Sequence, residues 1–373
     1  MKITILQGAF LPVPPVMGGA VEKMWFLLGQ RFAELGHEVV HVSRRHDGMP
    51  AHEMLAGVRH HRVRGFDTPG NGLMLKALDG AYTLGALGAL PDADILVTNT
   101  FWSPILARHR HGRTVVDVAR MPKGQMRLYR RAACLRANST PVRSAIIRED
   151  PSAAPRTRII ANPLTFIPRG DVDPKGKKPV LLYTGRIHPE KGIELLLESF
   201  SSLPASVRES WELRLVGPAE TRHGGGGEKW AASLAKRFEN SGTIHWVGPI
   251  FDAEALNREY REARFFVYPS LAEKGETFGL SPLEAMAWGC VPLVSDLECF
   301  KDFITDGHNG MIFDHRQNAV ENLASLLGRV CECSDAEFRE WSGNCISVRE
   351  SHSVASIADQ FLELFQELVG ASD

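Results

Sequence analysis

The fold is decided by residues 269–289, PSLAEKGETFGLSPLEAMAWG, which predict a strand end, a loop and a helix start. Residues 263–268, just before them, form a short run of aromatic and β-branched residues that is typical of a buried strand. Ser281 is expected to cap the helix, with Glu284 completing a capping box and Gly289 ending the helix. Such a helix start presents free backbone N–H groups at its positive end, so the stretch predicts an anion site.

Two glutamates in this stretch are predicted to have separate roles. Glu276 lies in the loop, whereas Glu284 lies in the first turn of the helix. Even on one continuous helix they would be ~80° apart, and the Gly and Pro residues between them argue against such a helix. The paired carboxylates of a glycosidase are therefore not indicated. The local sequence leaves two roles open for Glu284, which are the cap alone or the cap together with a ligand contact.

The segment from Glu276 to Pro292 resembles the E-x7-E signature of retaining glycosyltransferases of family 4. The resemblance implies an α/β protein with the GT-B fold, in which two Rossmann-like domains face each other across a donor cleft. It implies that Glu276 is a catalytic residue beside the donor sugar and that Glu284 binds the ribose hydroxyls. The backbone amides that would hold sugar hydroxyls and phosphate are those of Phe278, Gly279 and Leu280.

A second candidate ligand-binding segment lies at the start of the second half of the chain. An apolar strand at residues 180–184 is followed by Gly185, Arg186 and, five residues later, Lys191. Two cations beside glycines at the carboxyl end of a strand suit a diphosphate. The segment matches the family pattern G-R-x4-K-G, which implies that Gly185 lies in the donor site and that Arg186 and Lys191 bind the diphosphate and assist catalysis. We expect both cations to be partly exposed.

Further donor contacts are implied by the resemblance alone. The family has a Gly-rich loop after its first strand, and here Gly18 and Gly19 follow a first strand and precede a helix at residues 20–34. The strand at residues 244–249 matches the family position that faces the nucleotide base, which assigns Val247 and Gly248 to the donor site.

Three polar residues near strand ends in the first half are candidates for the acceptor side, although each is also compatible with an ordinary loop or cap. They are Asn99, Asp117 and Lys123. Family members commonly carry His where this chain has Asn99, and an amide side chain hydrogen bonds but does not titrate.

The predicted domains follow from a linker at residues 168–179, which is rich in Pro, Gly, Lys and Asp. We expect an N-terminal Rossmann-like acceptor domain at residues 1–168 and a nucleotide-sugar donor domain at residues 179–352. Apolar residues recur at helical spacing in residues 353–373. The resemblance implies that this last helix crosses back to the N-terminal domain.

Composition describes a soluble globular protein, with 44% hydrophobic and 23% charged residues in a chain of 373. The six cysteines form no C-x2-C pair, and the N-terminus is too short and too broken by Pro and Gly for a signal peptide, so a reducing cytoplasm is expected. No D-x-D follows the carboxyl end of a predicted strand and no His or Cys cluster has ligand spacing, so the sequence does not suggest a metal site. We expect no metal and no cofactor besides the donor substrate.

Charge is unevenly divided along the sequence. Up to Gly170 there are 23 basic and 12 acidic residues, a net +11, and the remainder carries a net −12. A basic half suits an anionic acceptor or the inner face of the cytoplasmic membrane, whereas nucleic acid is disfavoured because no binding motif accompanies the charge. Residues 127–136 are basic and helix-compatible, which suggests a surface helix or one that lies on a membrane.

The prediction is a retaining, metal-independent hexosyltransferase that uses a nucleotide diphosphate sugar. A UDP-sugar is the favoured donor and GDP-mannose the second candidate. The acceptor is expected to be a carbohydrate or glycolipid hydroxyl, as in cell-envelope glycan synthesis. Two alternatives stay open, a non-hydrolysing sugar-nucleotide epimerase and a catalytically silent carbohydrate-binding subunit. A dinucleotide oxidoreductase is disfavoured because G-x-G-x-x-G is missing after the first strand.

Overall fold

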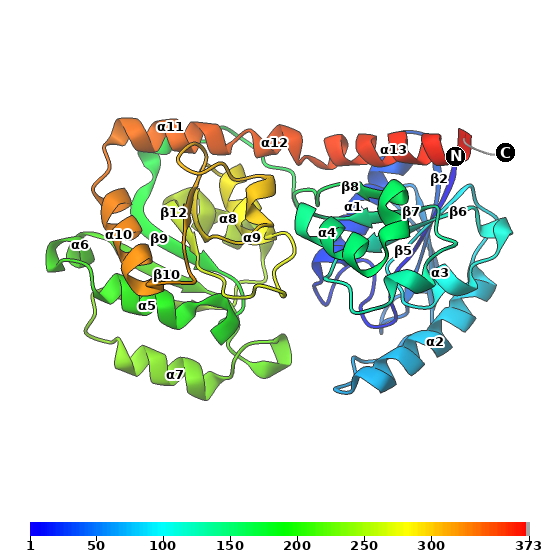
Figure 1. Ribbon diagram of the computed structural model, residues 1–373, viewed down its shortest axis with the longest axis horizontal. Helices are drawn as coiled ribbons and strands as arrows, with labels where there is room; N and C mark the ends of the chain where they lie inside the picture. The colour runs from blue at the N-terminus through cyan, green and yellow to red at the C-terminus, as the bar shows by residue number, and fades with distance from the viewer. Residues whose placement is uncertain (371–373) are drawn as a thin grey trace. The chain divides into compact units, whose positions relative to one another are not determined.

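The computed structural model describes residues 1–370, which form two compact α/β units (Figure 1). Unit 1 comprises Met1–Ile167 together with the chain from His352 onward, and unit 2 comprises Pro168–Ser351. Each unit has its own sheet with helices packed on both faces, so its inner strands are almost continuously apolar.

Unit 1 contains an eight-stranded sheet in the order β3-β4-β2-β1-β5-β6-β7-β8, parallel except for the antiparallel pair β3 and β4. Its strands are β1 (Lys2–Leu6), β2 (Glu38–Arg44), β3 (His52–Leu55), β4 (Val58–Val63), β5 (Ile95–Thr98), β6 (Arg113–Val118), β7 (Cys134–Ala137) and β8 (Thr157–Ile159). Its α-helices are α1 (Ala20–Glu34), α2 (Gly72–Ala89), α3 (Ser103–Leu106), α4 (Thr140–Glu149) and α13 (Val354–Gly370).

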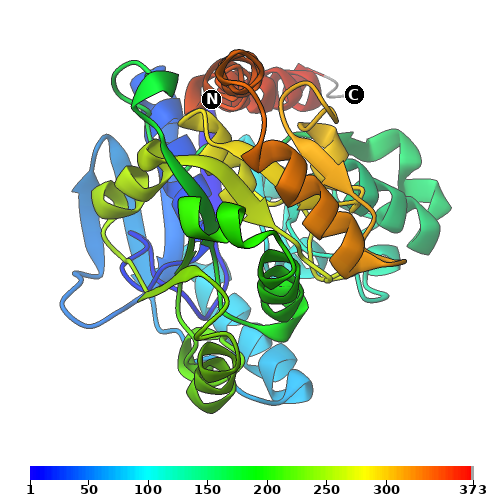
Figure 2. The ribbon, with the colours of Figure 1, turned by 90° about the vertical axis from the view of Figure 1, so that its left-hand side faces the viewer.

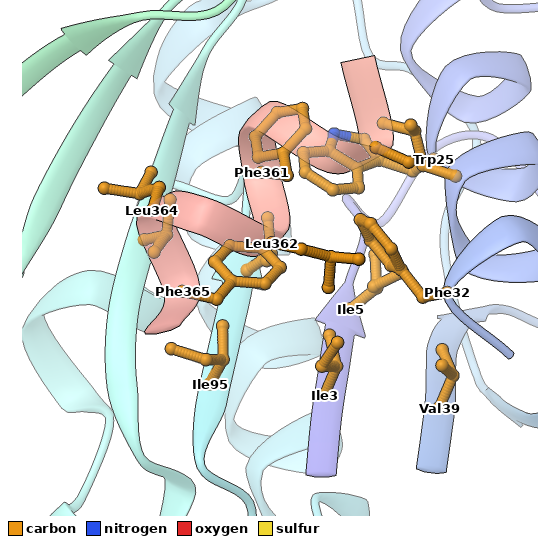
Figure 3. Close-up of a cluster of buried hydrophobic side chains, with 14 of the residues drawn as sticks. Ile3, Ile5, Trp25, Phe32, Val39, Ile95, Phe361, Leu362, Leu364 and Phe365 are labelled. Atoms are coloured by element: carbon orange, nitrogen blue, oxygen red, sulfur yellow. The ribbon is translucent and has the colours of Figure 1, made fainter. Parts of the chain in front are cut away.

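The last helix is part of the core of unit 1. Trp25 of α1 packs on Phe361 of α13 with ring centroids 4.9 Å apart, and Phe32 packs on Phe365 at 5.8 Å. Figure 3 shows these rings above apolar side chains of the central strands, among them Ile3. Helix α13 therefore covers the sheet of unit 1 although it follows unit 2 in the sequence.

Unit 2 contains six parallel strands in the order β11-β10-β9-β12-β13-β14. They are β9 (Lys178–Thr184), β10 (Glu212–Val216), β11 (Thr243–Gly248), β12 (Ala263–Tyr268), β13 (Val291–Ser295) and β14 (Met311–Phe313). The helices are α5 (Ile193–Ser201), α6 (Ala205–Ser210), α7 (Glu228–Arg237), α8 (Ala253–Glu262), α9 (Leu280–Ala287), α10 (Ala319–Cys331), α11 (Asp335–Cys345) and α12 (Val348–Ser351). Figure 2 gives a second view of the strands and helices of this unit.

The helix expected at residues 127–136 is absent, and that prediction is wrong. A short 3-10 turn at Met126–Leu128 leads instead into β7, where Arg136 is fully buried. The Arg136 guanidinium donates to Asp117 at 2.7 Å and to the carbonyl of Ile160 at 2.7 Å. The sequence suggests that Arg136 faces solvent, but its charge is buried because Asp117 is buried beside it and pairs with it.

The charge division is also smaller between units than between halves of the sequence. The segment from His352 onward has four acidic and no basic residues, and it belongs to unit 1. Unit 1 therefore has 22 basic and 16 acidic residues, a net +6, and unit 2 has 21 and 28, a net −7. In the described part of the chain, no helix combines the length and the apolar character needed to cross a membrane.

Candidate functional site

A pocket of about 190 Å³ opens in unit 2 at the carboxyl ends of β9 and β10. In a parallel α/β sheet these ends form the usual ligand crevice. One wall is made by Gly185 and Arg186, and another by Glu284 of α9. The loop after β11 adds an apolar part of the lining, formed by Pro249, Ile250 and Phe251. The pocket thus joins both segments that the sequence marked out.

Helix α9 begins two residues earlier than expected, so the predicted capping box is wrong. Its N-cap is Gly279, with φ 88°, and a Cβ at this position would lie 2.4 Å from the Phe300 ring. Leu280 and Ser281 therefore form the first turn, where backbone N–H groups have no partner within the helix. Glu284 does not cap the helix, because it lies in the second turn.

The other end of α9 is as predicted. Gly289 has φ 64°, its N–H donates to Met286 O, and the N–H of Cys290 donates to Ala285 O. This pair of bonds is the Schellman motif, which favours glycine at the left-handed position. Phe278, just before the helix, is buried against Phe303, with ring centroids 5.3 Å apart. Hydrogen bonds at the C-terminal end of α9 and the Phe278–Phe303 contact before its N-terminal end therefore fix the direction of the helix.

Tyr260 of α8 is a pocket residue that the sequence analysis missed. Its buried hydroxyl lies 2.6 Å from Thr184 Oγ1 and donates to Glu284 Oε2 at 3.4 Å. Burial, and next the negative charge of Glu284, raises the pKa of Tyr260 well above its usual value, so the phenol stays a donor. No sequence motif identifies this tyrosine, because in the sequence it looks like any other residue on the buried face of a helix.

Lys177 supports the helix that carries Tyr260. Its buried ammonium group donates to the carbonyl oxygens of Tyr260, Arg261 and Ala263 at 2.9–3.1 Å. These three acceptors lie at the C-terminal end of α8, where cations are favoured. Burial lowers the pKa of Lys177 to about 8. The sequence placed this residue in a solvated linker and gave no sign of its burial.

Lys191 and Glu276 form an ion pair, with Nζ and Oε2 2.6 Å apart. Their side chains are only 9% and 11% exposed, so the expectation that Lys191 is partly exposed is wrong. The cause is the contact between their two loops, in which Leu271 N–H donates to Glu190 O at 2.8 Å. Ser270 Oγ also donates to Glu276 at 3.3 Å. The structure thus brings together two motifs that are 85 residues apart.

Arg186 is more accessible, as expected, with 43% of its side chain exposed. It donates to the carbonyl of Gly224 and to Glu190, both at 2.8 Å. Val247 is 43% exposed on β11, and the carbonyl of Gly248 accepts from Gly217 N–H. Neither Val247 nor Gly248 lines the pocket in the described part of the chain, because the next three residues form that wall.

In unit 1, Gly18 and Gly19 have φ values of 81° and 99°, which favour glycine, and Gly19 is the N-cap of α1. A Cβ on Gly19 would lie 2.1 Å from Glu22 Oε2, so the Glu22 carboxylate folds back over this turn. Burial raises the pKa of Glu22. The sequence analysis had not singled out Glu22.

The three acceptor-side candidates differ in their surroundings. Asp117 is buried and accepts from Trp25 Nε1 and Arg136 Nη1, both at 2.7 Å, so its carboxylate already has two partners within unit 1. Asn99 lies at the end of β5, and Oδ1 has no hydrogen-bond partner among the described residues. Lys123 is exposed. Among residues 1–370, no group of three or more His, Cys, Asp or Glu side chains is placed to hold a metal ion.

Residues 168–340 match the family model described as "Glycosyl transferases group 1". Similar proteins include glycogen synthase 2 of Nitrosococcus oceani, 26% identical over 199 residues (51% of this chain, 38% of that protein). The O-antigen chain mannosyltransferase B of Escherichia coli is 32% identical over 146 residues (39% and 35%). The matched regions thus span well under half the length of these relatives.

Solved structures with the same fold cover the whole chain. Sucrose-phosphate synthase from Thermosynechococcus elongatus has a TM-score of 0.80 at 22% identity, covering 100% of both chains. WaaG, a glycosyltransferase involved in lipopolysaccharide biosynthesis, has a TM-score of 0.67 at 16% identity, covering 97% of this chain and 99% of that one. These likenesses, with the two sheets of mainly parallel strands, confirm the predicted GT-B fold.

Proposed function

We propose that this chain, whose residues 168–340 match the family model of glycosyl transferases group 1, transfers a hexose-type sugar from a nucleotide diphosphate sugar to an acceptor hydroxyl. The observation that carries the proposal is the pocket lined by Arg186 and the first turn of α9, together with the Lys191–Glu276 pair formed by the loops that follow the neighbouring strands β9 and β12. We infer that the reaction retains the anomeric configuration, as in glycosyltransferase family 4, and needs no metal.

The donor diphosphate is proposed to bind between the two cations and the start of α9. The N–H groups of Leu280 and Ser281, which have no partner within the helix and lie at its positive end, suit phosphate oxygens. Glu284, oriented by Tyr260, would accept hydrogen bonds from ribose hydroxyls. The apolar wall after β11 suits the flat face of a base. The site therefore has one feature for each part of a nucleotide diphosphate.

Catalysis is proposed to depend on charge stabilisation. As the bond from the sugar C1 to the diphosphate breaks, Arg186 and Lys191 stabilise the negative charge that grows on the leaving group. The acceptor oxygen bonds to C1 on the same face, and its proton passes to the departing phosphate oxygen. Glu276 lies against Lys191, where it would stabilise the positive charge that develops on the sugar. Cations from the chain thus take the role of a divalent metal.

A UDP-sugar is the favoured donor and GDP-mannose the second candidate. The structurally similar HepE of Anabaena has been solved in complex with UDP, and the similar Escherichia coli protein is a mannosyltransferase. The test is a thermal-shift screen of UDP, GDP and ADP sugars. A ligand at 100 times its dissociation constant stabilises the fold by roughly 2.7 kcal/mol. No stabilisation by any sugar nucleotide would overturn the donor assignment.

Turnover separates the proposal from its two alternatives. A transferase consumes the donor only with an acceptor, an epimerase converts the sugar nucleotide alone, and a silent subunit binds without turnover. The anomeric configuration of the product, read by NMR, tests retention. Full activity in EDTA is expected, and activity that returns only with magnesium or manganese would contradict metal independence.

The acceptor is proposed to be a carbohydrate or glycolipid, with anionic groups favoured by the net +6 charge of unit 1. Such attraction is screened over about 8 Å at physiological salt, so the apparent acceptor affinity should fall as salt rises. Arg130 and Arg131 are exposed, and changing both to Gln should weaken the salt dependence. The six free cysteines fit the proposed cytoplasmic location.

A further inference from the structure

The edge strand of the unit 1 sheet carries a histidine directly opposite a histidine of its neighbour. Strands β3 and β4 form a hairpin whose turn consists of Ala56 and Gly57, with φ values of 47° and 78°. A two-residue turn with both φ values positive fixes the register of the two strands. This register pairs His52 of β3 with His61 of β4. The sequence analysis had singled out neither histidine.

The position of this pair in the hairpin brings the two side chains especially close. Arg62 N–H donates to Ala51 O at 2.8 Å, so these two residues form a hydrogen-bonded pair, and the next pair, His52 and His61, is a non-hydrogen-bonded one. Side chains approach most closely at non-hydrogen-bonded pairs. The two imidazole rings accordingly have centroids 4.0 Å apart, with their planes at 56°. His52 is exposed and His61 is half-buried, so the pair is accessible to solvent.

The hydrogen bond of His61 leaves its other ring nitrogen available to a ligand. Nδ1 of His61 lies 3.2 Å from Ala89 O, at the C-terminal end of α2. Because a carbonyl oxygen only accepts, Nδ1 carries the proton and Nε2 of the neutral ring has a lone pair. Histidines that bind metals use the same arrangement, in which the second ring N–H donates to a backbone carbonyl. Helix α2 therefore orients His61 as a metal ligand would be oriented.

We propose that His52 and His61 together bind a divalent late transition metal ion, such as Cu²⁺, Ni²⁺ or Zn²⁺. Imidazole suits these ions, whereas Mg²⁺ and Ca²⁺ prefer oxygen ligands. Two nitrogens that share one zinc ion lie about 3.3 Å apart, because each Zn–N bond is about 2.0–2.1 Å long. Rotation of the exposed His52 ring brings one nitrogen of each ring to about this separation, since the centroids are so close. Water completes the coordination, because the described residues contain no group of three ligating side chains.

A bound ion would hold the edge strand on the sheet. Strand β3 is the outermost strand, and β4 is its neighbour. An ion that bridges both strands stabilises their pairing, because it binds the folded hairpin and not the unfolded chain. The site is distinct from the donor chemistry, since every residue that lines the donor pocket belongs to unit 2. Removal of the ion by EDTA should therefore leave the transfer reaction unchanged.

The test is isothermal titration calorimetry of the full chain with Ni²⁺, and with Mg²⁺ as the negative control. The wild type should bind Ni²⁺ and not Mg²⁺. His52→Asn should weaken Ni²⁺ binding by roughly tenfold or more, because even the loss of an outer-shell partner costs about 10–100-fold. The matched control is His109→Asn, an exposed histidine of unit 1 outside the hairpin, which should bind like the wild type. Urea denaturation without metal should show both variants folded.

Hydrogen exchange with mass spectrometry locates the ion. Ni²⁺ should slow exchange in peptides that cover residues 51–63 of the wild type but not of His52→Asn, and EDTA should reverse the effect. His52→Asn with His61→Asn should bind no more weakly than His52→Asn alone, because removing either ligand destroys the chelate. Equal affinity of His52→Asn and the wild type, or protection confined to other peptides, would overturn the proposal. Failure of the donor proposal would instead appear as lost nucleotide binding with metal binding intact.

Discussion

The Lys191–Glu276 ion pair determines how much stability is lost when either residue is substituted. Breaking a buried ion pair leaves the remaining charge without its partner, which destabilises a protein by about 3 kcal/mol or more. Lys191→Ala should therefore lower both the free energy of unfolding and the turnover, since both side chains are largely buried. The measurement is urea denaturation together with the transfer rate.

Two matched variants separate stability from chemistry at this pair. Lys191→Met with Glu276→Gln removes both charges and should recover much of the stability while staying inactive. Arg186→Gln changes an exposed cation and should lose donor affinity with little change in stability. Full activity in Arg186→Gln or Lys191→Ala would refute the diphosphate assignment.

Tyr260 is expected to act as a positioning residue for Glu284. Tyr260→Phe removes the hydroxyl that contacts Thr184 and Glu284, so the carboxylate loses its orientation. We expect a loss of nucleotide affinity of about tenfold, with about 1–2 kcal/mol of stability lost because Thr184 is left unpaired. Isothermal calorimetry and denaturation measure the two effects.

The control for Tyr260 is Tyr82→Phe. Tyr82 is equally buried, but its hydroxyl has no hydrogen-bond partner among the described residues. Removing that hydroxyl should leave stability and nucleotide affinity unchanged or improved. If Tyr260→Phe binds nucleotide like the wild type, Glu284 is oriented by other contacts and the positioning role is wrong.

At the scale of elements, the packing between the neighbouring strands β2 and β4 is expected to be sensitive to acid. His60 is fully buried and stacks on His41 with ring centroids 5.4 Å apart. Burial, and next the charge of Arg62, lowers the pKa of His60 to about 4, although Glu53 opposes this. Burial, followed by the charges of His60 and Arg62, lowers the pKa of His41 well below its usual value.

The sign of the effect follows from proton binding. The unfolded chain binds protons near pH 6.5, whereas folded His60 does so only near pH 4. The stabilising contribution is therefore complete above pH 6.5 and is lost as pH falls towards 4, by about 3 kcal/mol for His60. His60→Leu should flatten the pH dependence of urea denaturation, whereas His109→Leu, at an exposed position, should not. An unchanged slope in His60→Leu would contradict this account.

The elements that sequence reasoning predicts best are those with one strong local pattern. Helix α1 and the apolar strands β9 and β12 were predicted within a residue or two because burial imposes their spacing. The start of α9 was misplaced, since Gly279 is selected by the Phe300 ring across the fold and not by its neighbours. Arg136 was misread for the same reason, because its partner Asp117 lies on another strand.

The candidate site shows the same limit. Arg186, Lys191, Glu276 and Glu284 were identifiable because motif spacing is local in the sequence. The ion pair between two of them, and the support that Tyr260 gives to Glu284, depend on contacts between separate loops and helices. No periodicity encodes such contacts.

At the scale of the whole molecule, chain order and unit membership differ. Helix α13 follows unit 2 in the sequence but supplies Phe361 and Phe365 to the core of unit 1. Phe361 lies against Trp25, and the Arg136 guanidinium stands 5.6 Å from its ring centroid. A substitution in α13 should therefore destabilise unit 1, although unit 2 is its neighbour in the sequence.

Phe361→Ala tests this expectation against Phe338→Ala. Both rings are almost fully buried, so each variant should cost about 3–5 kcal/mol. Phe361 packs in the core of unit 1, whereas Phe338 packs on Phe265 in unit 2. Limited proteolysis with mass spectrometry should show new cleavage within residues 1–167 for Phe361→Ala and within 168–351 for Phe338→Ala. Cleavage confined to unit 2 in Phe361→Ala would show that α13 does not stabilise unit 1, because loss of one of its two fully buried rings would then leave that core protected.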